Sequence, residues 1–131
     1  MYCFSVKLND NFDNAIKRVT EALQQEKFGI LNEISVSTVL KNKLNIDIPH
    51  YRILHACNPS FANRMISKEA NAGCLLPCNV VVREEGEGSI MVAFMDPVTV
   101  FGLTNNPETL VIAEEAKQGL MKVRDTLASS K

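Results

Sequence analysis

Residues 51–97 read YRILHACNPSFANRMISKEANAGCLLPCNVVVREEGEGSIMVAFMDP and decide the fold. The stretch opens with an apolar run, Tyr51–Cys57, which has the length and composition of a strand. Asn58 and Pro59 follow at once. This pair is a strong helix start, because the asparagine amide caps the helix and proline suits its first position. The first part of the stretch therefore predicts a strand that runs directly into a helix.

The second part of the stretch predicts a hairpin. Two alternating runs, at about 76–84 and 89–95, flank the acidic link Glu85-Gly86-Glu87-Gly88. Two glycines in a short link between alternating runs are typical of the turn between antiparallel strands. Asp96-Pro97 is expected to end the second arm.

The flanking sequence adds two strands and three helices. Alternation and the spacing of apolar residues predict these elements at residues 2–8 (strand), about 11–27 (helix), 30–36 (strand), 37–44 (helix) and about 106–127 (terminal helix). In the strand at 30–36, Ile30 and Ile34 are expected on one face and Glu33 on the other. Residues 98–105 show no clear period and are predicted to be irregular.

The element order β-α-β-α-β-α-β-β-α predicts an α+β protein. We expect a single mixed or antiparallel sheet of about five strands, with helices packed on one face. The 131 residues are expected to form one domain, 1–131, that is long enough to bury a core without disulfides. Apolar residues make up 46% and charged residues 22%, which is typical of a soluble globular protein.

Net charge and hydropathy indicate which kinds of binding partner the protein lacks. The net charge is −1 and the basic residues are spread out, so we expect no nucleic-acid partner. No apolar stretch approaches the roughly 20 residues that span a bilayer, and the first residues lack the pattern of a signal peptide. The expectation is a cytoplasmic protein without a membrane partner.

Two cysteines lie at junctions between predicted elements. Cys57 ends a strand one residue before the Asn58 cap, where the positive end of the helix dipole favours the thiolate and lowers the thiol pKa. Cys78 follows Pro77, which belongs at a strand start because proline cannot donate to a sheet. Both cysteines also fit a purely structural role, because free cysteine is among the most buried residue types.

Two further side chains are candidate partners for these thiols. Glu33 could act as a base or ligand if its strand face meets Cys57, although a solvated carboxylate explains it equally well. His55 lies two residues before Cys57 and so shares its strand face. No Cys-x-x-Cys pair or common zinc spacing occurs in the sequence, so neither a metal site nor a cofactor is expected.

The sequence resembles the bacterial and archaeal family called domain of unknown function 302. The similarity is carried by the blocks Phe28–Ile34, Tyr51–Leu54, Ala56–Pro59, Leu75–Val82 and Asp96-Pro97. The resemblance implies a compact α+β fold likened to that of the TATA-binding protein, homodimers and no established activity. It also marks Glu33, Cys57, Asn58, Pro59, Pro77 and Cys78 as motif positions. His55 departs from the family pattern, in which glycine is usual.

The residues and the resemblance support two hypotheses. The first is a small-molecule or sulfur-handling site, with Cys57 as nucleophile, Cys78 beside it, Glu33 tuning charge, and Asn58, Pro59, Pro77 and His55 around them. The second is a non-catalytic module with structural cysteines that forms a homodimer or binds a partner protein. A structural metal site is a weaker third interpretation, because only two thiols are well placed.

Overall fold

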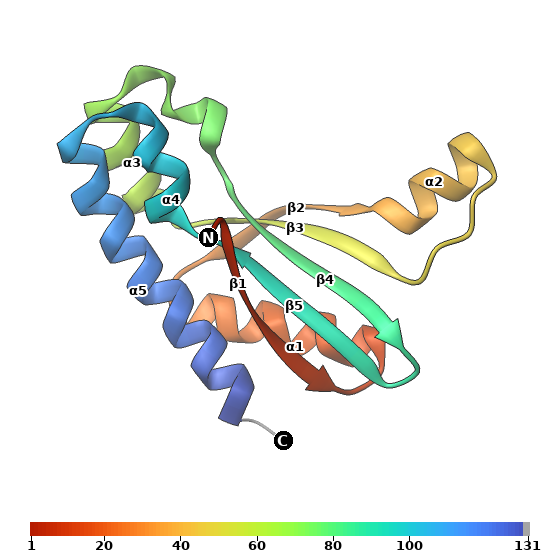
Figure 1. The fold of residues 1–131 in the computed structure, drawn as a ribbon. Coiled ribbons are helices and arrows are strands. Elements are labelled where there is room, and N and C mark those ends of the chain that lie inside the picture. The colour runs from red at the N-terminus through yellow and green to blue at the C-terminus, as the bar shows by residue number, and fades with distance from the viewer. Residues whose placement is uncertain (130–131) are drawn as a thin grey trace.

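The computed structural model describes residues 1–129, which form one five-stranded sheet and its covering helices (Figure 1). The strands are β1 (Cys3–Asn9), β2 (Gly29–Ser35), β3 (Tyr51–Cys57), β4 (Cys78–Gly86) and β5 (Ser89–Met95). They lie in the order β1-β5-β4-β3-β2, and every neighbouring pair is antiparallel. The predicted α+β class and single five-stranded sheet are confirmed, with the sheet antiparallel rather than mixed.

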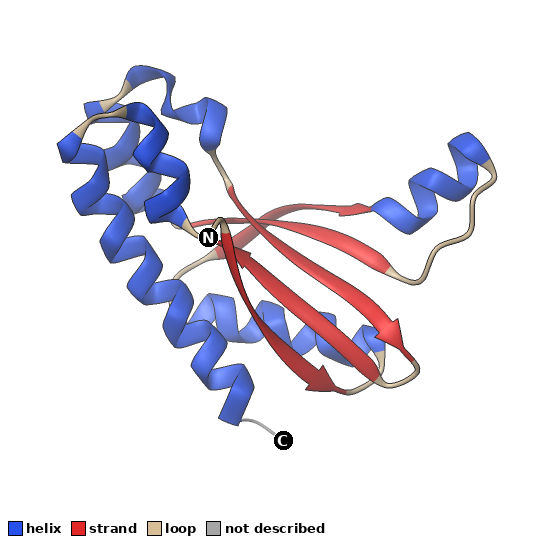
Figure 2. Ribbon diagram, in the orientation of Figure 1, coloured by secondary structure: helices blue, strands red, loops and turns tan. Residues whose placement is uncertain are grey.

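The helices are distributed between one face of the sheet and its two ends (Figure 2). Their bounds are α1 (Phe12–Gln25), α2 (Val36–Leu44), α3 (Pro59–Lys68), α4 (Pro97–Phe101) and α5 (Pro107–Ser129), with short 3₁₀ helices η1 (Ala70–Leu75) and η2 (Gly102–Thr104). Helices α1 and α5 cover the face on which the core forms. Helices α3 and α4 lie against α5 at one end, and α2 projects from the other. Within residues 1–129, no helix is long and apolar enough to cross a membrane.

The core lies between the sheet and helices α1 and α5. Leu54, Val80 and Phe94 come from three adjacent strands and are fully buried beneath the helices. Phe28 precedes β2 and is also buried, with its ring 3.0 Å from the place where a Cβ on Gly119 of α5 would stand. Alternate residues such as Ile53, Val81 and Ala93 face the other side of the sheet, which carries no helix layer. The alternation in the sequence therefore marks the buried face.

Strand β2 contains a bulge that the sequence pattern does not reveal. Ile30 lies opposite Ala56, whereas Asn32 lies opposite His55, so Leu31 is the extra residue. A bulge shifts all later side chains to the other face. Ile30 therefore packs on the core, and Ile34 lies on the opposite face. The prediction that these two isoleucines share a face is wrong.

Residues 98–105 are helical rather than irregular. Asp96 caps α4, because its carboxylate accepts hydrogen bonds from the backbone N–H groups of Val98 (2.9 Å) and Thr99 (3.4 Å). The same carboxylate forms an ion pair with Lys117 on α5 at 2.9 Å. The Asp96-Pro97 pair is thus a helix start of the same kind as Asn58-Pro59, and the order of elements gains a helix between β5 and α5.

Candidate functional site

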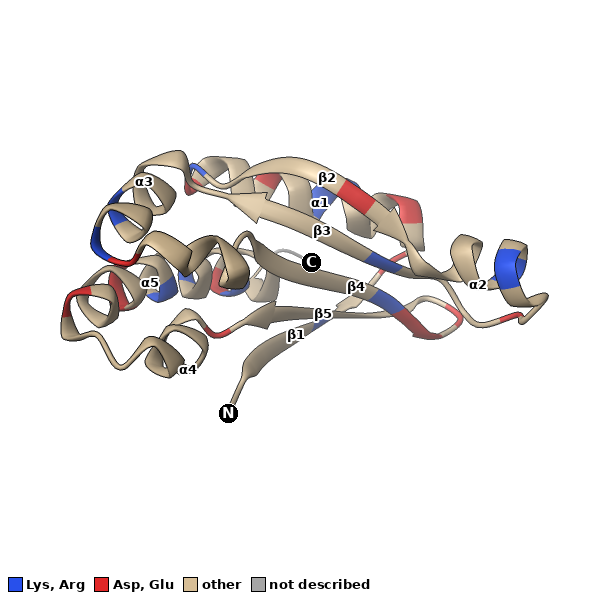
Figure 3. Cartoon of the chain, turned by 90° about the horizontal axis from the view of Figure 1, so that it is seen from above, with Lys and Arg blue, Asp and Glu red and all other residues tan. Residues whose placement is uncertain are grey.

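A small apolar cavity lies where β3 ends and β4 begins, between this end of the sheet and helices α3, α4 and α5. Its volume is about 20 Å³. The residues that line it are Phe28, Ala56, Cys57, Asn58, Phe61, Ala62, Met65, Leu76, Pro77, Cys78, Phe101 and Ala116. None of these side chains is charged, and the ends of β3 and β4 beside α3 carry no charged residue in Figure 3. The cavity is therefore a site of low polarity with room for little more than one water-sized group.

The cavity brings together the two cysteines that the sequence singles out. The sheet register pairs Ala56 with Cys78, so Cys57 lies one residue beyond the position opposite Cys78, where β3 ends and the chain turns into α3. Strand geometry places their Cα atoms about 6 Å apart. Both side chains line the cavity, Cys78 being buried and Cys57 half-buried. The structure thus places the two cysteines from separate blocks of sequence in the wall of one cavity, and their joint role as a site stays a prediction.

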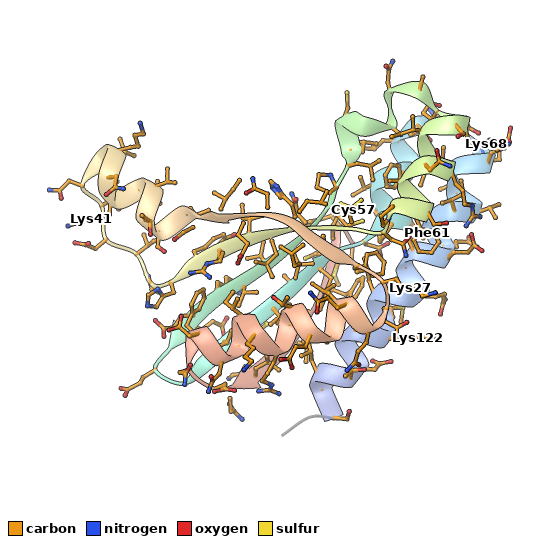
Figure 4. All side chains as sticks on the ribbon, turned by 180° about the vertical axis from the view of Figure 1, so that it is seen from behind. Lys27, Lys41, Cys57, Phe61, Lys68 and Lys122 are labelled. Carbon is orange, nitrogen blue, oxygen red and sulfur yellow. The ribbon has the colours of Figure 1, made fainter. Side chains whose placement is uncertain are left out.

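The start of α3 holds one wall of the cavity in place. The side-chain oxygen of Asn58 accepts hydrogen bonds from the backbone N–H groups of Ser60 (3.0 Å) and Phe61 (3.3 Å). Pro59 occupies the first helical position, as the sequence predicts. Figure 4 shows Cys57 and Phe61 close to each other in the corner between the sheet and α3. On the β4 side, Pro77 follows a cis peptide bond and lines the cavity next to Cys78.

The electrostatics of the thiols differ from the expectation. Burial raises the pKa of the Cys57 thiol. Burial, reinforced by the neighbouring Cys57, raises the pKa of Cys78 to about 12. The expectation of a lowered pKa at Cys57 is contradicted, because the helix-start N–H groups donate to Asn58 and the surroundings are hydrocarbon. Both sulfurs are therefore protonated thiols at neutral pH.

Three of the predicted site residues do not line the cavity: Pro59, which starts α3, and the two candidate partners of the thiols, Glu33 and His55. Glu33 lies opposite Leu54 in the register and forms an ion pair with Arg52 at 3.6 Å. His55 lies between Asn32 and Asn79 on the sheet face that has no helix layer. Neither residue lines the cavity, so the structure does not bring Glu33 or His55 together with the thiols.

Several residues of the cavity wall escape the sequence analysis as site residues. Phe61 and Met65 are four residues apart on α3, which is the spacing of one helix face. This spacing marks them as core, and Met65 is indeed only 2% exposed. Phe28 and Phe101 reach the cavity from elements distant in sequence, and no local pattern identifies them.

The fold and the cavity define a small α+β protein with one buried and one half-buried cysteine in a cavity at one end of its sheet. The chain belongs to the family described as "Domain of unknown function DUF302", whose pattern matches residues 4–127. A solved structure described as an uncharacterized conserved protein DUF302 from Bacillus stearothermophilus is similar, with 30% sequence identity and a TM-score of 0.90. The similarity covers 97% of this chain and 98% of that one.

No curated protein matches the chain. The family identity therefore confirms the resemblance that the sequence shows but assigns no activity. The likeness to the TATA-binding-protein fold stays a prediction.

Proposed function

We propose that the protein binds a small sulfur-seeking ligand at the Cys57/Cys78 cavity. The observation that supports this proposal is that two thiols from separate strands line a single cavity with no charged side chain. Cys57 is half-buried and serves as the thiol that meets the ligand first, and Cys78 is its buried neighbour. Asn58, Pro59 and Pro77 position the two sulfurs by fixing the backbone on either side.

The proposal gives Glu33 and His55 no part at the cavity. The cavity volume of about 20 Å³ also restricts the bound part of the ligand to one atom or a very small group. We take residues 1–131 as one domain that acts in the cytoplasm, where thiols stay reduced. No nucleic-acid or membrane partner is included.

A trivalent arsenical that bridges two thiols tests the proposal directly. Methylarsonous acid forms two As–S bonds with a close dithiol, and its two hydroxyl groups leave with the thiol protons as two molecules of water. We expect the protein to retain one equivalent against excess glutathione, as measured by intact mass spectrometry, because both sulfurs face one cavity.

The matched control is the double variant Cys3→Ser/Cys74→Ser, which removes the two cysteines outside the cavity and is expected to retain the arsenical. Cys57→Ser and Cys78→Ala are each expected to lose it. Retention by either single variant, or no retention by the native protein, would contradict the proposal.

A second function, self-association through α2, is favoured by the exposure of that helix. Helix α2 has no buried residue, and the apolar side chains of Val39 and Leu44 are 45% and 62% exposed. Helix α2, whose last turn carries basic residues, and the acidic β4–β5 turn lie at the same end of the molecule (Figure 3). A two-fold axis at this end would place the basic helix of one copy near the acidic turn of the other. The second copy of this chain is therefore the proposed occupant.

Sedimentation velocity tests this second function. We expect a dimer for the native protein and a monomer for Val39→Glu/Leu44→Glu, because the two charges would be buried in the interface. Leu103→Glu is the matched control, since Leu103 is 74% exposed on η2 near the opposite end and should leave the dimer intact. A native protein that sediments as a monomer would rule the dimer out.

A further inference from the structure

A third sulfur lies in the wall of the cavity. Met65 is on α3, its side chain is only 2% exposed, and it lines the same cavity as Cys57 and Cys78. Apart from these three residues, the wall holds only apolar side chains and the Asn58 amide, which is occupied by capping α3. Within residues 1–129, no group of three or more His, Cys, Asp or Glu side chains is placed to hold a metal ion. The donor set at this cavity is therefore made of sulfur alone.

We propose that this cavity is a binding site for a soft monovalent metal ion, Cu(I), with Cys57 and Cys78 as thiolate ligands and Met65 as a thioether ligand. The inference rests on the proposed function and names the ligand of the same site. Thiolate and thioether sulfur select Cu(I) over hard cations, which need oxygen ligands. Zinc is disfavoured as well, because a structural zinc site requires four nitrogen, sulfur or oxygen donors.

The dimensions of the cavity agree with a single ion. Its volume is about 20 Å³. Pockets for organic ligands usually measure about 300–1,000 Å³, so this one is too small by more than tenfold. An ion with few ligands needs no coordinated water, which suits a wall formed by Phe28, Phe61 and Phe101.

The charge balance is also favourable. On binding, two S–H bonds break, two S–Cu bonds form and the two protons leave to solvent, while the copper remains Cu(I). The resulting site carries one net negative charge. The cation cancels one of the two thiolate charges, so only a single charge remains among the apolar side chains of the wall. The half-buried Cys57 gives the ion a route in, and Cys78 and Met65 complete the site from inside.

Anaerobic titration with Cu(I) against a coloured Cu(I) chelator tests the inference. Cys3→Ser/Cys74→Ser serves as the parent protein, because it keeps the cavity and removes the other two thiols. We expect one Cu(I) per chain in the parent. Adding Cys57→Ser or Cys78→Ala should weaken binding by about a hundredfold or more, because one thiolate is lost.

Met65→Leu distinguishes a ligand from a packing residue, because leucine keeps the volume and removes the sulfur. We expect unchanged stoichiometry and an affinity about tenfold weaker, with the longer Cu–S distance of the thioether absent from the X-ray absorption spectrum. Circular dichroism of each variant verifies that it is folded. Equal affinity for Cu(I) with and without the Met65 sulfur would overturn the three-sulfur site.

Failure of the inference and failure of the proposed function give different results. If the parent protein captures the bridging arsenical but binds no Cu(I) in competition with the chelator, the copper site is overturned and the thiol pair stands. If the arsenical is not retained either, both are overturned.

Discussion

Replacing Phe94 by alanine is expected to lower the free energy of unfolding by about 3–5 kcal/mol. Phe94 lies on β5, between β1 and β4 in the sheet, its side chain is 0% exposed, and its ring stacks on Phe4 with centroids 5.5 Å apart. It also lies opposite Val80 on the neighbouring strand. Truncation at this position removes contacts in three strands at once, because the rigid sheet cannot collapse into the space. Urea denaturation at neutral pH measures the loss.

Two matched substitutions separate packing from a general effect of mutation. Phe94→Leu retains most of the buried volume and should cost roughly 1–2 kcal/mol. Leu103→Ala removes a side chain that is 74% exposed and should change stability by no more than about 0.5 kcal/mol. A Phe94→Ala protein as stable as Leu103→Ala would show that this part of the core is not closely packed.

The second large effect is expected at Asp96. Asp96→Ala should cost about 2–4 kcal/mol at neutral pH, because it removes an N-cap and a charge-assisted hydrogen bond together. Asp96 is 7% exposed and joins the start of α4 to Lys117 of α5. Asp96→Asn keeps an oxygen that can cap the helix but loses the charge. It should therefore lower the free energy of unfolding by about half as much as Asp96→Ala does. Thermal and urea unfolding of the three proteins measure the difference.

The Asp96 contribution also depends on pH. Burial alone would raise the pKa of this carboxyl, but the Lys117 ammonium and the N–H groups of Val98 and Thr99 outweigh it and hold the pKa below its ordinary value of 3.8. A lowered pKa in the folded state adds stability that is complete above the unfolded-state pKa and disappears as pH falls through the folded-state pKa. The native protein should therefore exceed Asp96→Asn in stability at neutral pH and lose this advantage below about pH 4. If the stability difference between the native protein and Asp96→Asn instead grew as the pH fell, the stabilising role of the Asp96 charge would be contradicted.

The sequence predicts most of the fold because local signals agree with the tertiary structure. The apolar run of β3, the two runs that flank the glycine-containing link between β4 and β5, and the Asn58-Pro59 cap each predict their element without distant contacts. Helix α4 escapes prediction because five residues are too few to show a helical period, and only the Asp96 cap marks it. The Leu31 bulge escapes because it depends on pairing with β3.

The sequence predicts the two cysteines of the candidate site but not how deeply the surrounding residues bury them. Cys57 ends β3 and Cys78 begins the neighbouring strand β4, so both cysteines line the same cavity. Burial raises the pKa of both thiols, and part of the cavity wall, Phe28 and Phe101, comes from distant positions in the chain. Glu33 is excluded from the site by the strand register, since it lies beside Arg52.

The close approach of Phe28 to Gly119 has a consequence for the thiol cavity. The aromatic ring that forms part of the cavity wall occupies the space that any side chain at position 119 would need. Because Gly119 of α5 has no side chain, the Phe28 ring can occupy its place in the cavity wall. A bulkier residue at position 119 would displace the Phe28 ring and so change the shape of the cavity without altering either cysteine.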